Sequence, residues 1–160
     1  MGVVRTQVAI EGELEYIFEC SWDFDLLCAF NPSVKSVEIR QSSEKVRRYK
    51  VEEEFSGALC GYVAERTATS PTHILYRETI PVKFLKSHEV SWKFRPQGKH
   101  VLVEAEEHFD IDMDQAPGLL PLGTQPEEVV RKMLSFSTLE TLRNLKEYVE
   151  LELMLQPAVA

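Results

Sequence analysis

Between residues 34 and 112, apolar and polar side chains alternate with few interruptions, and this alternation limits the fold more than any other feature of the chain. A period of two residues is typical of β-strands that bury one face. Turn-forming residues divide the region into a strand that opens at Val34 and strands at 45–55, 58–68, 72–80, 87–95 and 99–112. Parallel neighbours would need crossovers of a dozen residues or more, so the short breaks predict an antiparallel meander.

The segment before the meander combines one more strand with two short helices. Residues 3–11 alternate as a strand does, and Gly12 ends the pattern. Helical segments fit 13–20 and 22–30, and Asn31-Pro32 ends the second because a residue before proline avoids helical backbone. The chain is therefore predicted to be an α+β protein with a seven-stranded antiparallel sheet.

The last part of the chain changes from a strand pattern to a helix pattern. Residues 113–124 hold two prolines and two glycines, so we expect a loop with neither helix nor regular pairing. Thr124 and Glu127 have the spacing of a capping box, and helix-favouring residues continue to about Leu155, which gives a helix roughly 45 Å long. Its early apolar residues, from Val129 to Phe136, and its late ones, from Leu139 to Val149, centre on different sides. A curved sheet that grips the helix would accommodate both groups.

Composition excludes several classes of protein. The 160 residues suit one domain over 1–160, and 44% apolar with 28% charged residues is normal for a globular chain. The 18 basic against 26 acidic residues do not supply the cationic face that nucleic acid requires. No run of 18 apolar residues occurs, so we expect no membrane span.

The cysteines favour a reducing compartment. Cys20, Cys28 and Cys60 form no CxxC pair and are odd in number, which suits inert thiols and a cytoplasmic location better than a disulfide framework. No second His or Cys shares a strand face with His88 at ligand spacing, so we expect no metal and no other cofactor.

Strand phase places two titratable residues among apolar ones. In 101–113 the apolar face carries a single charge, Glu107, which must be paired or protonated if it is buried. The alternative is a glutamate at a sheet edge or facing water in an open mouth. In 87–95 the phase of Val90, Trp92 and Phe94 includes His88, which is either a hydrogen-bonded core residue or a proton carrier.

The strand at 58–68 has two possible inward faces. Tyr62 and Arg66 share one phase with Ala58, Cys60 and Ala64, whose small side chains would leave room for a ligand. If this phase is inward, Arg66 projects a permanent cation into the cavity. Otherwise Arg66 lies at the strand end and pairs with Glu65 or Glu78.

Several stretches of this chain resemble the helix-grip superfamily of START-related lipid carriers and the birch-pollen allergen family, and most of all bacterial polyketide aromatase/cyclases of the tetracenomycin type. The similarity runs from about residue 5 to residue 150. The stretches that carry it are Val8-Ala9-Ile10-Glu11, Phe30 to Ile39, Ala64-Glu65-Arg66, Tyr76-Arg77-Glu78-Thr79, Val90 to Arg95 and Glu107-His108-Phe109-Asp110.

The resemblance implies a cavity closed by the C-terminal helix, with Arg66 at the place of an arginine that acts on the polyketide. It departs from the cyclases where their aromatic pocket residues become Val34, Tyr62 and Ala105, and where Ile80-Pro81-Val82 replaces Gly-Pro-Phe.

We therefore expect binding of a poly-β-ketone followed by aldol cyclisation and dehydration, as in antibiotic biosynthesis. Arg66 would polarise a ketone, Tyr62 would donate a hydrogen bond, and Glu107 or His88 would relay protons. The expected ligand-binding wall is formed by Trp92, Phe94, Phe109, Val90 and Ala105. An acyl carrier protein is the expected macromolecular partner, and the chain itself would be a monomer or a homodimer. Two alternatives are a non-enzymatic carrier of a lipid or quinone, and an interaction module with a collapsed interior.

Overall fold

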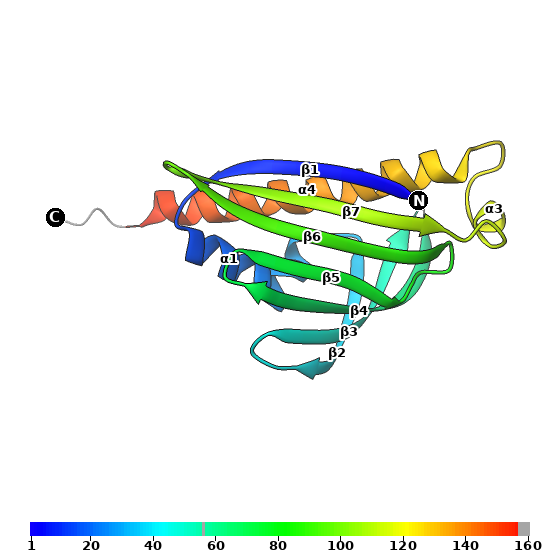
Figure 1. The fold of residues 1–160 in the computed structure, drawn as a ribbon, viewed down its shortest axis with the longest axis horizontal. Helices are drawn as coiled ribbons and strands as arrows, with labels where there is room; N and C mark the ends of the chain where they lie inside the picture. Colours follow the sequence, from blue (N-terminus) through cyan, green and yellow to red (C-terminus); the bar gives the residue numbers. More distant parts are fainter. Residues whose placement is uncertain (56, 157–160) are drawn as a thin grey trace.

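A long helix lies against a curved seven-stranded sheet in the computed structural model of this chain, which describes residues 1–55 and 57–156 apart from the side chain of Leu27 (Figure 1). All neighbouring strands are antiparallel, in the order β1-β7-β6-β5-β4-β3-β2. The elements are β1 (Gly2–Glu11), α1 (Leu14–Trp22), α2 (Phe24–Phe30), β2 (Val34–Ser42), β3 (Val46–Phe55), β4 (Ala58–Ser70), β5 (His73–Ile80), β6 (Leu85–Gln97), β7 (His100–Ile111), α3 (Ala116–Leu119) and α4 (Pro126–Leu155). This is the helix-grip arrangement expected from the sequence.

Two expectations about the segment before α4 are wrong. The loop at 113–124 contains the short helix α3, whose Leu120 amide donates to the carbonyl of Ala116. Pro117 fits there because a proline in the first turn of a helix has no amide to satisfy. Thr124 does not cap α4: Gln125 is the N-cap residue, and the Thr124 hydroxyl donates to the carbonyl of Pro121 instead.

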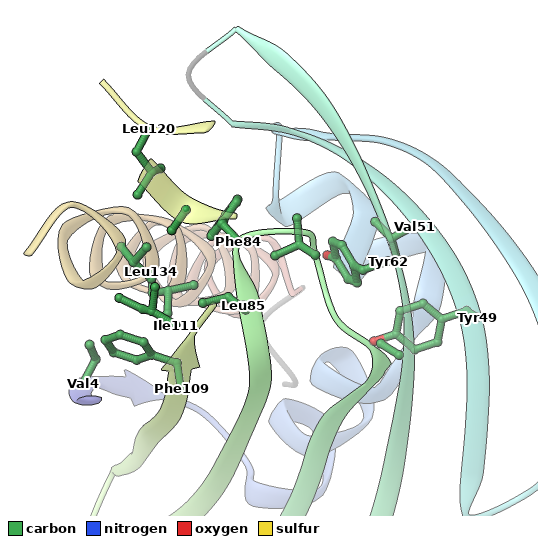
Figure 2. Packing of buried hydrophobic residues seen from close by; sticks show 14 of the residues in the cluster. Val4, Tyr49, Val51, Tyr62, Phe84, Leu85, Phe109, Ile111, Leu120 and Leu134 are labelled. Carbon is green, nitrogen blue, oxygen red and sulfur yellow. The ribbon is translucent and has the colours of Figure 1, made fainter. Parts of the chain in front are cut away.

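The apolar interior has two parts, and α4 contributes to both. Its first half packs Val130 and Leu134 against Phe84, Leu85 and Ile111 at one end of the sheet (Figure 2). Its second half packs Leu142, Leu145 and Val149 against the other end. This division explains why the early and late apolar groups centre on different sides of the helix. Phe136, placed by sequence in the early group, is instead 72% exposed because it lies on the outer side of α4.

Side chains of α4 also bond the outer edge of β1. Arg131 donates to the carbonyl of Val3, and Lys146 Nζ donates to the carbonyl of Ala9 at 2.8 Å. Backbone groups at a sheet edge are otherwise open to another strand. The helix therefore covers this edge as well as the concave face. No described helix is long and apolar enough to cross a membrane.

Candidate functional site

A cavity of about 130 Å³ lies between the curved sheet and the first half of α4. Much of its wall is apolar, and Figure 2 shows Tyr49, Val51 and Tyr62 of β3 and β4 on one side with Phe84 and Leu134 on the other. Its polar lining comes from the strands β3 to β7, from α4, and from α2 with the residue that follows it: Cys28, Asn31, Tyr49, Glu53, Tyr62, Arg66, Tyr76, Glu78, His88, Glu107, Ser137, Thr138 and Thr141. The chamber is thus apolar with several buried charges.

A continuous chain of hydrogen bonds crosses β5, β6, β7 and α4. Both ring nitrogens of His88 contact carboxylates, Nδ1 that of Glu78 and Nε2 that of Glu107 at 3.1 Å. The Thr138 hydroxyl donates to Glu107 Oε2 at 2.8 Å, and the Tyr76 hydroxyl donates to Glu78 Oε2 at 3.1 Å. The Val82 amide donates to Glu78 Oε1. Every carboxylate oxygen of Glu78 and Glu107 therefore has a donor.

The two carboxylates decide the charge of His88. Burial disfavours the charged imidazole, but the opposing charge of Glu78 and the hydrogen bonds to Glu107 and Glu78 raise the pKa of His88 to about 10. The ring is therefore an imidazolium at neutral pH and donates from both nitrogens. With neither nitrogen free, His88 cannot accept a proton from a ligand directly.

A second polar cluster surrounds Glu53 of β3. The Tyr62 hydroxyl donates to Glu53 Oε2 at 2.7 Å, and Ser33 Oγ and Asn31 Nδ2 donate to Oε1 at 2.7 and 3.3 Å. Burial is the main cause that raises the pKa of Tyr62 well above its ordinary value, so the phenol stays protonated. Its one proton is committed to Glu53, and only its lone pairs remain for a ligand.

Arg66 differs from the other buried charges because it has no hydrogen-bond or ion-pair partner among the residues that the structure describes. Its side chain is 2% exposed, and Nη1 has no hydrogen-bond partner. Among the described residues it forms no ion pair; its aromatic neighbour is Trp22, whose ring centre lies 5.8 Å from the guanidinium carbon. Burial lowers the pKa of Arg66, yet a guanidinium stays charged in proteins. A buried cation with a free N–H is a site for a hydrogen-bond acceptor.

The residues predicted as catalytic all line this cavity, and the inward phase of β4 is the one that holds Tyr62 and Arg66. Glu107 is 2% exposed and paired, so it is neither at an edge nor in an open mouth.

The five residues predicted to form the binding wall divide into two groups. Trp92 and Val90 line the cavity, whereas Phe94, Phe109 and Ala105 are buried but are not among its lining residues. Phe94 and Ala105 pack towards the far end of the sheet, where Phe94 meets Phe18 edge-on. The ring of Phe109 packs against Gly2 of β1. Their strand faces were predicted correctly, but they lie beyond the cavity along their strands.

Sequence reasoning missed several residues of the site, among them Glu53, Tyr76, Thr138 and the role of Glu78 as a partner of His88. Glu53 shares the phase of Tyr49, Val51 and Phe55, so the signal was present within the acidic run 52–54. Tyr76 and Glu78 share the phase of buried Ile74 in the same way.

The described residues include no group of three or more His, Cys, Asp or Glu side chains placed to hold a metal ion. The three cysteines are free, and burial raises the pKa of each thiol.

Comparison with solved structures identifies the same fold in several proteins. The Zhui aromatase/cyclase from Streptomyces sp. R1128 has a TM-score of 0.81 at 16% identity, over 99% of each chain. A protein from Thermus thermophilus has a TM-score of 0.79 at 18% identity, over 94% of this chain and 99% of its own. A STAR-related lipid transfer protein fragment from Xanthomonas axonopodis has a TM-score of 0.66 at 14% identity, over 92% and 85%. At these identities the likeness establishes the fold alone.

A search of curated protein sequences finds no match. A family model described as polyketide cyclase / dehydrase and lipid transport matches residues 10–138, which is most of the chain. The chain therefore belongs to this polyketide cyclase, dehydrase and lipid-transport family.

Proposed function

We propose that this protein binds a poly-β-ketone in the cavity and promotes its intramolecular aldol cyclisation and dehydration. The observation that carries the proposal is the buried Arg66 guanidinium with an unpartnered N–H, in a chamber whose other buried charges are paired. A carbonyl oxygen is the acceptor that a poly-β-ketone offers. Hydrophobic binding alone would need no buried cation, and burying one without a partner is unfavourable for folding.

Arg66 would act on the oxygen where negative charge develops. In the aldol step a methylene C–H bond breaks, its carbon bonds to a ketone carbon, and that ketone oxygen becomes an alkoxide. A guanidinium already in place stabilises this charge without having to reorganise. The alkoxide then takes up one proton to become a hydroxyl, which balances the proton lost from the methylene. Loss of this hydroxyl with one α-hydrogen gives a double bond and water.

Tyr76 is the residue best placed to pass protons between the ligand and Glu78. It lies directly opposite Arg66 in the β4–β5 register, and its hydroxyl is bonded to Glu78. Burial raises the pKa of Tyr76 well above its ordinary value, so it would pass a proton on to Glu78 as it accepts another, without becoming a phenolate. In this scheme His88 holds Glu78 and Glu107 in place as a fixed cation, and Tyr62 accepts a hydrogen bond from the ligand.

The proposal can be tested with a poly-β-ketone made in situ on an acyl carrier protein by a minimal ketosynthase. We expect the wild-type chain to change the distribution of cyclised products, measured by liquid chromatography with mass spectrometry. Arg66→Met should abolish this change and Tyr76→Phe should weaken it. Arg48→Met is the matched control, because Arg48 points to the outer face and pairs with Glu65 at 2.6 Å.

A product distribution that is the same with and without the wild-type chain would contradict the cyclase proposal. If the chain nevertheless binds the polyketone tightly, the carrier function is correct instead, a function that the apolar half of the cavity wall would serve.

A further inference from the structure

Two arginines lie side by side on the concave face of the sheet. Arg47 of β3 and Arg66 of β4 are directly opposite each other in the strand register. Like charges at directly opposed positions repel, and such pairs destabilise a sheet. The repulsion by Arg47 contributes to the lowered pKa of Arg66, after burial. The fold therefore keeps an arrangement that is unfavourable in the empty protein.

The two arginines have no carboxylate partner in the described part of the chain. Within the described residues neither arginine forms an ion pair, and each has a buried side-chain nitrogen without a hydrogen-bond partner, Nε of Arg47 and Nη1 of Arg66. They contact the indole of Trp22 instead, with guanidinium carbons 4.9 and 5.8 Å from its ring centre. Arg47 also donates to the carbonyl of Trp22 at 2.6 Å.

The nearby acidic groups are engaged elsewhere or exposed. Arg47 itself lines a second groove together with the exposed Glu19, Asp23 and Asp25, and Asp23 accepts hydrogen bonds from the backbone amides that begin α2. In the cavity, the carboxylates of Glu53, Glu78 and Glu107 have donors on all of their oxygens. The other groups that influence Arg66 are the protonated side chains of Tyr49, Tyr76 and Cys28.

We propose that the Arg66 end of the cavity binds an anionic oxygen of the ligand, a carboxylate or an enolate, and that Arg47 strengthens its hold from the neighbouring strand. This inference rests on the proposed function and adds that the ligand bound at this site carries a negative charge. A neutral ketone would satisfy the free N–H of Arg66 but would leave its buried positive charge without a counter-charge. An anion would accept a hydrogen bond from this N–H and also supply the opposite charge, and buried charges are stable only when paired.

The carboxylate can be tested with two aromatic probes of similar shape, 2-naphthoate and 2-acetylnaphthalene, by isothermal titration calorimetry on the full chain. We expect naphthoate to bind at least about tenfold more tightly, which corresponds to about 1.4 kcal/mol. Arg66→Met should remove the preference, Arg66→Lys should keep part of it, and Arg47→Met should reduce it several-fold. Arg48→Met, on the opposite face and paired with Glu65, should leave it unchanged.

The enolate can be tested with a soluble β-diketone, benzoylacetone, whose enolate absorbs at longer wavelength than its neutral form. Saturating wild-type protein should lower the apparent pKa of the probe by about one unit or more, and Arg47→Met should lessen this shift. A shift without naphthoate preference would identify the enolate as the bound anion, and the converse would identify the carboxylate.

Equal affinity for naphthoate and acetylnaphthalene together with an unshifted diketone pKa would overturn the anion inference and leave the proposed cyclase intact. Failure of all three probes to bind would overturn both. Because Arg47→Met leaves the cavity lining in place, the inference stays testable even if Arg66→Met does not fold.

Discussion

Replacing Arg66 with methionine should leave the fold as stable as the wild type or make it more stable, which is unusual for a residue only 2% exposed. Methionine keeps the unbranched apolar stem and removes the charge. The change relieves an unsatisfied buried donor, worth about 1–3 kcal/mol, and loses a cation–π contact with Trp22, worth about 0.5–2 kcal/mol. Relief of repulsion from Arg47 adds to the gain. We expect the free energy of unfolding to rise by about 1 kcal/mol, or a Tm increase of about 2–4 °C for a chain of this size.

Urea unfolding at equilibrium, followed by circular dichroism, would measure this difference, with an unchanged m-value as the sign that the same surface is exposed. Glu107→Met is the matched control, because Glu107 is equally buried but pairs with His88 and Thr138. Removing one partner of a buried ion pair costs about 3–5 kcal/mol. The two substitutions, to the same residue in the same cavity, should therefore change stability in opposite directions.

A loss of about 3 kcal/mol or more in Arg66→Met, the cost of breaking a buried ion pair, would refute the reasoning, because it would show that the guanidinium is part of a stabilising network. Its unpartnered N–H would then be no evidence for a ligand.

Two further predictions concern the hydrogen-bond chain. Because the pKa of His88 is raised from 6.5 to about 10 by folding, its contribution to stability is complete below about pH 6.5 and is lost as the pH rises towards 10. Urea unfolding from pH 7 to 10 should show wild-type stability falling by of order 1 kcal/mol per pH unit more than that of His88→Gln; parallel profiles would contradict the assignment. Thr138→Val should cost about 1.5–3 kcal/mol, because it removes a hydrogen bond to a charged, buried carboxylate. Thr141→Val, which loses only a bond to the carbonyl of Ser137 one turn back, should cost less in the same assay, and equal losses would argue against a special role for Thr138.

The fold was largely predictable because its determinants are local. Alternation identifies each strand to within about two residues, and short breaks dictate antiparallel neighbours. The start of α4 was less predictable: Thr124 has the chemistry of a cap, but the turn that begins at Pro121 takes its hydroxyl. The helix α3 was missed because its four residues include a proline and a glycine, which tertiary packing of Ala116 tolerates.

The sequence indicated which face of most strands points inward, but not how far along each strand the cavity extends. Period-two phase correctly brings His88 and Glu107 to the concave side, because a strand alternates without regard to what covers it. For Arg66 the sequence left both faces of its strand open, and only the structure shows that Arg66 and Tyr62 point inward. Phase says nothing about where along a strand the cavity ends, so it could not show that Phe94 and Phe109 lie outside the lining of this cavity. The pairing of His88 with both Glu78 and Glu107 depends on the register of β5, β6 and β7 together, and β6 and β7 pair with an irregularity between Leu85 and Ser87.

The bonds from Arg131 and Lys146 to β1 limit how this protein could assemble. With β1 covered by α4, β2 is the one strand of the described sheet whose outer side has no neighbour. Head-to-tail growth of a sheet from molecule to molecule requires two open edges on each copy, whereas one open edge permits only a closed two-fold pair of β2 strands. Charged Lys35, Glu38 and Arg40 along β2 disfavour even that pair. Pairing of strands between copies of the native protein therefore stops at two molecules.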